Sequence, residues 1–245
     1  MKTLLHLAAI AACATLFIAP ASAGVLYDNT NFYENQFEVD AFQFNSGFAT
    51  ANSFSLNANS TLNTIDIWVW ETAPASGLHV DDLTSVDWFV QYDNGSTNYP
   101  FDGGFAGFGT GTAGSSMTGT FVKAISLPGD GGPEVFDIYE EAIMVPDLLL
   151  YANQTYWLTL NAGVTTDGKP VYWDQSNGGS IGYIWGGGNP PANVDTFSSG
   201  GSESFILLGD PASGSGAGST PEPGTVTMLG GGLLVMAAYL RRKAR

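Results

Sequence analysis

The stretch LNTIDIWVWE, residues 62–71, decides the fold class of this chain. Its residues Ile65, Ile67 and Val69 alternate with Trp68 and Trp70, so that the two sets point to opposite faces of a β-strand. Both sets are apolar, and a strand with two apolar faces is typically buried on both sides. We therefore expect this strand to be central in its sheet, or to offer one face as a binding surface.

Outward from this stretch, period-two patterning returns in short segments separated by turns rich in Gly, Asn, Asp and Ser. Only residues 140–151 are compatible with a helix, and Pro146 interrupts them. Many short strands with almost no helix predict an all-β fold, an antiparallel β-sandwich or jelly roll. The further strands expected lie at residues 37–44, 53–56, 88–92, 120–125, 135–139, 155–161, 171–174, 182–185 and 204–208.

The first 23 residues have the pattern of a secretory signal peptide. Lys2 supplies a positive charge, and an almost wholly apolar run follows at residues 4–19. Ala21 and Ala23 then frame a small-residue cleavage site, so we expect the mature protein to begin at Gly24.

The other end of the chain combines a linker, a proline motif, an apolar run and a basic cluster. Residues 210–220, DPASGSGAGST, predict a flexible linker after a β-sandwich ectodomain at 24–209. The uncharged run 225–240, read as a single transmembrane helix, would span about 24 Å. A bilayer core is about 30 Å thick, so flanking residues would complete the crossing. The membrane stop in 241–245, expected on the cytoplasmic side, consists of Arg241, Arg242, Lys243 and Arg245.

Pro221, Glu222 and Pro223, followed by the apolar run and the basic stop, resemble the PEP-CTERM sorting domain of Gram-negative bacteria. The resemblance covers the segment 221–245 and implies recognition and cleavage near the motif by an exosortase, a membrane protease-transpeptidase. It implies export, membrane anchoring by the C-terminal helix, and then a cell-surface or extracellular location. The alternative is an unprocessed tail anchor. The same tail also occurs as the ice-binding protein C-terminal domain, but the ectodomain has no sustained threonine repeat.

The ectodomain and linker are strongly acidic. They hold 22 of the 23 Asp and Glu residues of the chain but only Lys123 and Lys169 of its seven basic residues, a net charge of about −20. Such a surface repels phosphate backbones, which excludes nucleic acid as a partner. The single cysteine, Cys13, lies in the signal peptide, so the mature protein has neither a disulfide nor a cysteine nucleophile.

No motif in the ectodomain predicts catalytic residues. Ser180 sits in a G-x-S-x-G pattern, but no helix and no histidine follow it. Residues 109–114 fit G-x-G-x-x-G without a βαβ unit around them. Zinc is disfavoured because His79 is the only histidine of the mature chain. We expect no cofactor, except that a structural calcium ion is a candidate at Asp81, Asp82 and Asp87, with exposed turn acids as the alternative.

Carbohydrate binding is the most specific alternative function. Exposed aromatic rings can stack on sugars, and neighbouring polar side chains can bind hydroxyl groups. The candidate sugar-binding residues are Trp173, Asp174, Gln175, Tyr183 and Trp185, with burial in the core as the competing interpretation.

Three functions therefore remain open from the sequence. The first is a non-catalytic surface or extracellular-matrix protein, which is exported by means of its signal peptide and sorted by an exosortase. The second is a polysaccharide-binding module of the exopolysaccharide matrix, and the third is a secreted glycan hydrolase. Acidic residues are too numerous for spacing alone to select a catalytic pair, so we favour the first function.

Overall fold

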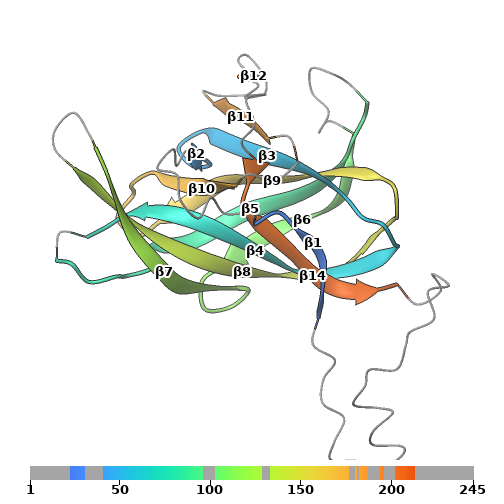
Figure 1. The fold of residues 1–245 in the computed structure, drawn as a ribbon, viewed down its shortest axis with the longest axis horizontal. Helices are drawn as coiled ribbons and strands as arrows, with labels where there is room; N and C mark the ends of the chain where they lie inside the picture. Colours follow the sequence, from blue (N-terminus) through green and yellow to red (C-terminus); the bar gives the residue numbers. More distant parts are fainter. Residues whose placement is uncertain are drawn as a thin grey trace, which may run out of the picture. The chain divides into compact units, whose positions relative to one another are not determined.

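The computed structural model describes residues 23–30, 41–74, 76–95, 103–128, 133–176, 180, 182–186, 194–195 and 202–212 (Figure 1). All of them belong to one unit, Met1–Ala212, and a second unit, Ser213–Arg245, lies outside the described residues. The described residues form strands β1 to β14 and no helix, which confirms the all-β prediction. Every pairing between these strands is antiparallel.

One of the two sheets has eight strands. Its central strand β4 (Ser60–Thr72) pairs along one edge with β8 (Glu134–Leu150), which pairs in turn with β7 (Met117–Leu127). The other edge of β4 is shared by β14 (Phe205–Pro211) and β10 (Val171–Ser176). The flanking strands are β1 (Gly24–Asp28) beside β14, and β2 (Ala41–Gln43) and β13 (Ser202–Glu203) beside β10.

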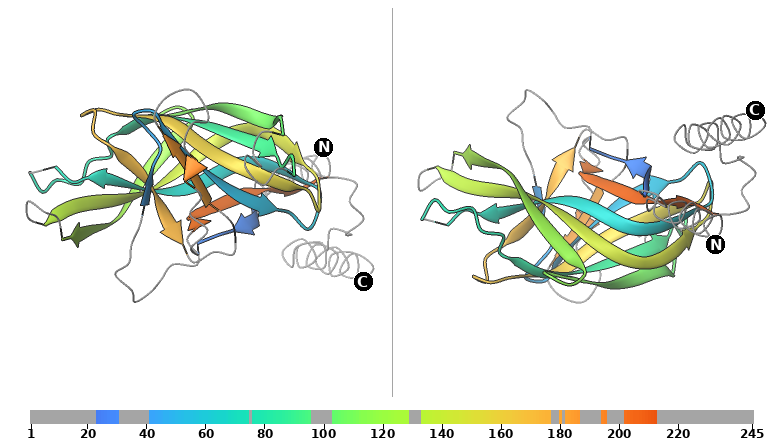
Figure 2. Two further views of the ribbon diagram at one scale, coloured as in Figure 1. Left: turned by 90° about the horizontal axis from the view of Figure 1, so that it is seen from above. Right: turned by 90° about the horizontal axis from the view of Figure 1, so that it is seen from below.

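The other sheet has six strands, and Figure 2 shows the strands of both sheets from two opposite sides. Its order is β12 (Val194–Asp195), β11 (Gly182–Gly186), β3 (Phe48–Ser55), β9 (Thr155–Thr165), β5 (Leu83–Tyr92) and β6 (Phe105–Thr112).

Strand β4 is central, as its two apolar faces predict. Ile65, Ile67 and Val69 are fully buried in a core that also takes large side chains from the six-stranded sheet. Trp68 and Trp70 are buried on the other face, in a separate cluster with side chains of β7, β8 and β10. Each such side chain stabilises the fold by about 1.5–3 kcal/mol through removal from water. This double burial explains why the stretch carries the strongest fold signal in the sequence.

The helix-compatible stretch 140–151 is a strand, because it continues β8 to Leu150. Pro146 lies at an irregularity of the β4–β8 ladder, between the pairs Leu62–Leu148 and Thr64–Met144. Three residues of β8 there face Asn63 alone, so the missing N–H of proline costs no ladder hydrogen bond. The proline therefore marks a bulge in a long strand.

The G-x-G-x-x-G segment lies in β6 and the turn that follows it. A Cβ atom on Gly109 would lie only 2.8 Å from the ring of Trp88. Gly107 and Gly111 similarly face Leu148 and Ile143. Glycine at alternate positions thus leaves room for core side chains, which gives the motif a packing role.

The two ends of the chain fall largely outside the described residues. Of the expected cleavage site, Ala21 is not described, whereas Ala23 is described and Gly24 is the first residue of β1. Within the described ranges, no helix has the length and apolar character needed to span a membrane. The expected helix 225–240, the motif at 221–223 and the basic stop lie outside these ranges, so the transmembrane helix stays a prediction.

Candidate functional site

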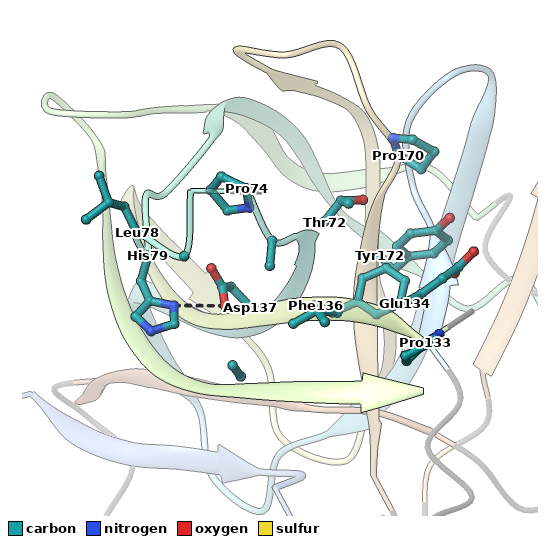
Figure 3. Close-up of a pocket in the computed structure, with 14 residues that line it drawn as sticks. Thr72, Pro74, Leu78, His79, Pro133, Glu134, Phe136, Asp137, Pro170 and Tyr172 are labelled. Carbon is teal, nitrogen blue, oxygen red and sulfur yellow. Dashed lines mark hydrogen bonds and ion pairs between the residues drawn. The ribbon is translucent and has the colours of Figure 1, made fainter. Parts of the chain in front are cut away.

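A pocket of about 640 Å³ opens where β4 ends and β8 begins (Figure 3). Residues 72–74, at the end of β4, and residues 77–79 form one wall, and residues 133–137, at the start of β8, form another. Pro170 and Tyr172 contribute from β10 and the turn before it, and Ala124 from β7. Residues from four strands, β4, β7, β8 and β10, thus meet at this pocket.

His79 and Asp137 form an oriented pair in the pocket wall. The Nδ1 atom of His79 lies 2.9 Å from Oδ1 of Asp137, and the Asp137 side chain is only 1% exposed against 45% for His79. The ring of Phe121 stacks on the imidazole with a centroid distance of 3.9 Å. Because Nδ1 is committed to the carboxylate, Nε2 is the ring nitrogen that remains for a ligand.

The opposite side of the pocket is aromatic. Phe136 and Tyr172 lie edge to face, with ring centroids 6.0 Å apart and an interplanar angle of 90°. Burial, and secondarily the negative charge of Glu134, raises the pKa of Tyr172. Its hydroxyl group therefore stays protonated and can donate a hydrogen bond. Apolar walls with a few polar groups are typical of small-molecule and carbohydrate-sized sites.

Next to the pocket, β8 carries Asp137, Tyr139 and Glu141 in a row on one face. Burial, and then the negative charges of Asp81 and Glu71, raises the pKa of Glu141 to about 9. Burial likewise raises the pKa of Glu71 to about 7, although its two carboxylate oxygens accept the backbone N–H groups of residues 82 and 83 at 2.7 and 2.8 Å.

Several polar atoms of this row lack partners. Among the described residues, no hydrogen-bond partner is found for Oδ2 of Asp137 or the hydroxyl oxygen of Tyr139, and no donor group other than the carboxyl group of Asp81 reaches the carboxylate of Glu141. All three side chains are at most 2% exposed. Buried polar groups are nearly always satisfied, so such a concentration points to water or an ion in the row.

The predicted calcium residues do not come together. Asp81 lies beside the row, whereas Asp82 Oδ1 accepts a hydrogen bond from Thr166 and Asp87 Oδ1 accepts one from Thr110 at 2.6 Å. Among the described residues, no group of three or more His, Cys, Asp or Glu side chains is arranged to hold a metal ion. The predicted calcium site formed by Asp81, Asp82 and Asp87 is thus wrong, because the carboxylates of Asp82 and Asp87 bind Thr166 and Thr110 and do not converge with Asp81.

The predicted sugar-binding residues do not share a surface either. Trp173 is fully buried in the main core, and its Nε1 donates to the carbonyl oxygen of Ser204 at 2.8 Å. Asp174 is buried and accepts hydrogen bonds from Trp70 Nε1 and the Ser204 hydroxyl. Neither can meet a sugar ring, so burial in the core is their correct interpretation.

The other three candidates lie elsewhere. Gln175 is half-buried and pairs with Glu203 of β13. Tyr183 is half-buried in β11 and packs against Trp157 with ring centroids 5.1 Å apart. Trp185 also belongs to β11, and its side chain lies outside what the structure describes. The candidates of β10 and β11 are close in the sequence, but the two strands belong to different sheets, so these residues do not form one sugar-binding site.

The sequence singled out none of these residues for the pocket. His79 entered only as the one histidine of the mature chain, and Asp137, Glu71, Glu141 and Tyr172 were missed as site residues. A signal was present in the inward positions of β8, where Asp137, Tyr139 and Glu141 interrupt an otherwise apolar alternation that continues with Ile143. Only the register of β8 against β4 shows that the side chains of Asp137, Tyr139 and Glu141 point into the protein.

Comparison with known proteins concerns the tail of the chain. Residues 219–243 match the family model described as the PEP-CTERM protein-sorting motif, whereas no curated protein matches the chain. This match confirms the resemblance seen in Pro221, Glu222 and Pro223 and the run that follows them. The chain carries a PEP-CTERM protein-sorting motif, which indicates an exported protein that an exosortase processes.

Proposed function

We propose that this protein is a non-catalytic surface or extracellular-matrix protein whose described residues form a β-sandwich displayed outside the cell. The observation that carries the proposal is the sorting motif at residues 219–243, placed shortly after the last strand β14, which ends at Pro211. The two antiparallel sheets share one buried core, which supports a sandwich that folds independently of the tail.

The placement of the pocket suits a display domain. Gly24 pairs with Gly209, and Pro211 pairs with Ser60 at the start of β4, so both ends of the described unit lie at one end of the eight-stranded sheet. Thr72, at the other end of β4, lines the pocket. In Figure 1 the arrowheads of β4 and β14 point in opposite directions. The pocket is roughly 40 Å along the strand from the start of the linker, since strands rise about 3.3 Å per residue.

Sorting is tested by replacing Pro221, Glu222 and Pro223 together with alanine in the full chain, expressed in an exosortase-bearing host. We expect the tail of the variant to remain attached and membrane-bound, whereas the wild-type protein is cut near the motif, because the altered peptide no longer matches the recognition sequence. Mass spectrometry of the C-terminal peptide measures this. The matched control is Pro211→Ala, ten residues before the motif, which should be processed normally. Equal processing of the triple variant would refute sorting through these residues.

The pocket favours polysaccharide binding as a second candidate function. Tyr172 and Phe136 offer aromatic surface, and Thr72, Glu134 and His79 supply hydroxyl, carboxylate and imidazole groups beside it. The pocket lies roughly 40 Å along the strand from the start of the linker, so the linker would not obstruct a polymer chain at the pocket. This location replaces the one predicted around Trp173, which is buried.

The pocket proposal predicts that Tyr172→Ala weakens binding of the host's own exopolysaccharide about tenfold, or about 1.4 kcal/mol. Tryptophan fluorescence reports binding, because Trp70 lies 5.8 Å from Phe136 between ring centroids. Tyr151→Ala, which removes a tyrosine that is 50% exposed and outside the pocket lining, is the matched control and should bind normally.

The same titration separates the remaining functions. A wild-type protein that gives no fluorescence change at high polymer concentration would remove the binding proposal and leave the structural role. Release of new reducing ends, lost in Asp137→Asn, would instead support the glycan hydrolase.

A further inference from the structure

We propose that Asp81 and Glu141 bind one calcium ion between the loop after β4 and the row of polar residues on β8. This site differs from the sequence prediction in its ligands, because it keeps Asp81 and replaces Asp82 and Asp87 with Glu141. It is independent of the sorting function proposed above.

The two carboxylates face each other over Gly119 of β7. A Cβ atom on Gly119 would overlap both Oδ2 of Asp81 and Oε1 of Glu141, so these two oxygens converge on the same small space. Gly119 is the cross-strand partner of Glu141 in the β7–β8 ladder. Glycine at this position leaves open the space that a side chain would fill.

Glu141 provides the observation that points to a ligand. Its side chain is 0% exposed, and no N–H or hydroxyl donor among the described residues reaches its carboxylate oxygens. Its one side-chain hydrogen bond is to the carboxyl group of Asp81, which requires a proton held between the two acids. A carboxylate buried in this way is costly unless it is neutralised. The nearest charged groups are the carboxylates of Asp81 and Glu71, which carry the same sign. A divalent cation would reverse this repulsion.

The chemistry of the site suits calcium. Calcium takes oxygen ligands, including carboxylates that bind through one or both oxygens, in a flexible geometry that water can complete. A bound ion would replace the proton that Glu141 holds, and the two ionised carboxylates would then carry two negative charges, which one divalent ion neutralises. Asp81 is half-buried and Gly119 is exposed, so an ion can reach the site from solvent.

The surrounding contacts hold the ligands in place. Oδ1 of Asp81 accepts the backbone N–H of Leu83 at 3.1 Å, which leaves Oδ2 on the side of Glu141. Glu71 accepts the backbone N–H groups of residues 82 and 83, and so fixes the loop that carries Asp81. His79 of the pocket lies two residues before Asp81 in the same loop. Calcium would therefore stabilise the wall of the pocket as well.

The test is thermal unfolding of the full chain after chelator treatment, with added CaCl2 or MgCl2. We expect Tm to rise by roughly 5–10 °C when calcium is present at about a hundred times its Kd. Magnesium at the same concentration should give a smaller rise, because it requires stricter octahedral geometry.

Variants decide whether the ion sits between the two carboxylates. Glu141→Gln and Asp81→Asn should each abolish the calcium-dependent rise in Tm, and Glu141→Gln should fold at least as stably as the wild type without calcium. Glu134→Gln removes an exposed carboxylate and should keep the full calcium response. A wild type whose Tm does not respond to calcium, or a Glu141→Gln variant that responds fully, would overturn the proposal and leave a shared proton as the link between the carboxylates.

Discussion

Replacing Trp173 with alanine should destabilise the protein by about 3–5 kcal/mol, the usual range for removing a fully buried large aromatic side chain. Trp173 is 0% exposed, packs against Phe205 with ring centroids 5.9 Å apart, and anchors Ser204 through its indole N–H. Chemical denaturation should show a lower midpoint with a similar m-value, since the change affects stability and not the surface exposed on unfolding.

The control for this change is Phe108→Ala, which removes an aromatic ring that is 66% exposed and should alter stability by no more than about 0.5 kcal/mol. Trp173→Phe should recover part of the loss, because it keeps a large ring but not the hydrogen bond to Ser204. If Trp173→Ala kept wild-type stability while losing polysaccharide binding, Trp173 would be a ligand contact and its placement in the core would be wrong.

Glu203→Gln should stabilise the protein at alkaline pH and remove part of its pH dependence. Burial raises the pKa of Glu203 to about 8, although Asn52 donates a hydrogen bond to its carboxylate. A group whose pKa is raised on folding contributes stability below its unfolded value, and that contribution is lost as the pH rises through the folded value. For Glu203 the loss falls between pH 4.5, the ordinary pKa of a glutamate, and about pH 8, its pKa in the folded protein.

The expected size of this effect is a few kcal/mol at pH 9, because a tenfold change in a proton-binding constant corresponds to about 1.36 kcal/mol. Denaturation curves between pH 4 and pH 9 measure it. Wild type and Glu203→Gln should be similar near pH 4 and diverge as the pH rises. Glu134→Gln, at an exposed glutamate, should follow the wild-type curve. Parallel wild-type and Glu203→Gln curves would show that Glu203 is ionised or solvated in the folded protein.

Two further buried acids act in the same direction at lower pH. Burial raises the pKa of Asp66 to about 6, helped by the negative charge of Glu140, and it raises the pKa of Asp174 to about 6 against two hydrogen bonds that lower it. Their contributions are lost between pH 3.8, the ordinary pKa of an aspartate, and about pH 6. The Glu203→Gln variant should therefore keep a decline in stability over that lower range.

The fold class could be predicted because period-two patterning is local. The stretch 62–71 carries apolar residues on both faces, and the structure makes it the central strand β4. The strand at 134–150 was predicted only over 135–139. Its continuation was missed, since the adjacent acids Glu140 and Glu141 and Pro146 resemble an interrupted helix when the bulge opposite Asn63 is unknown. Pairing partners depend on contacts between distant segments, which the pattern of one segment does not encode.

The candidate site was much less accessible from the sequence than the sorting motif. A sorting motif is a contiguous peptide, whereas the pocket joins residues from β4, β7, β8 and β10. Trp173 and Asp174 look suited to a sugar because aromatic and acidic residues adjoin, but neighbours in a strand face opposite sides and here both sides are covered. Glu141 looked like one of many surface acids until its inward register was known.

The position of β14 has a consequence for biogenesis. It is inserted between β1 and β4, so residues 24–28 and 60–67 both obtain their hydrogen-bonding partner from residues 205–211. Contacts of such long range form late, because the intervening chain must first be present and close a large loop. A polypeptide that threads through a translocation channel from its N-terminus can pair β4 with β8 early, but it can complete the sheet with β14 only once residues 205–211 have emerged on the far side.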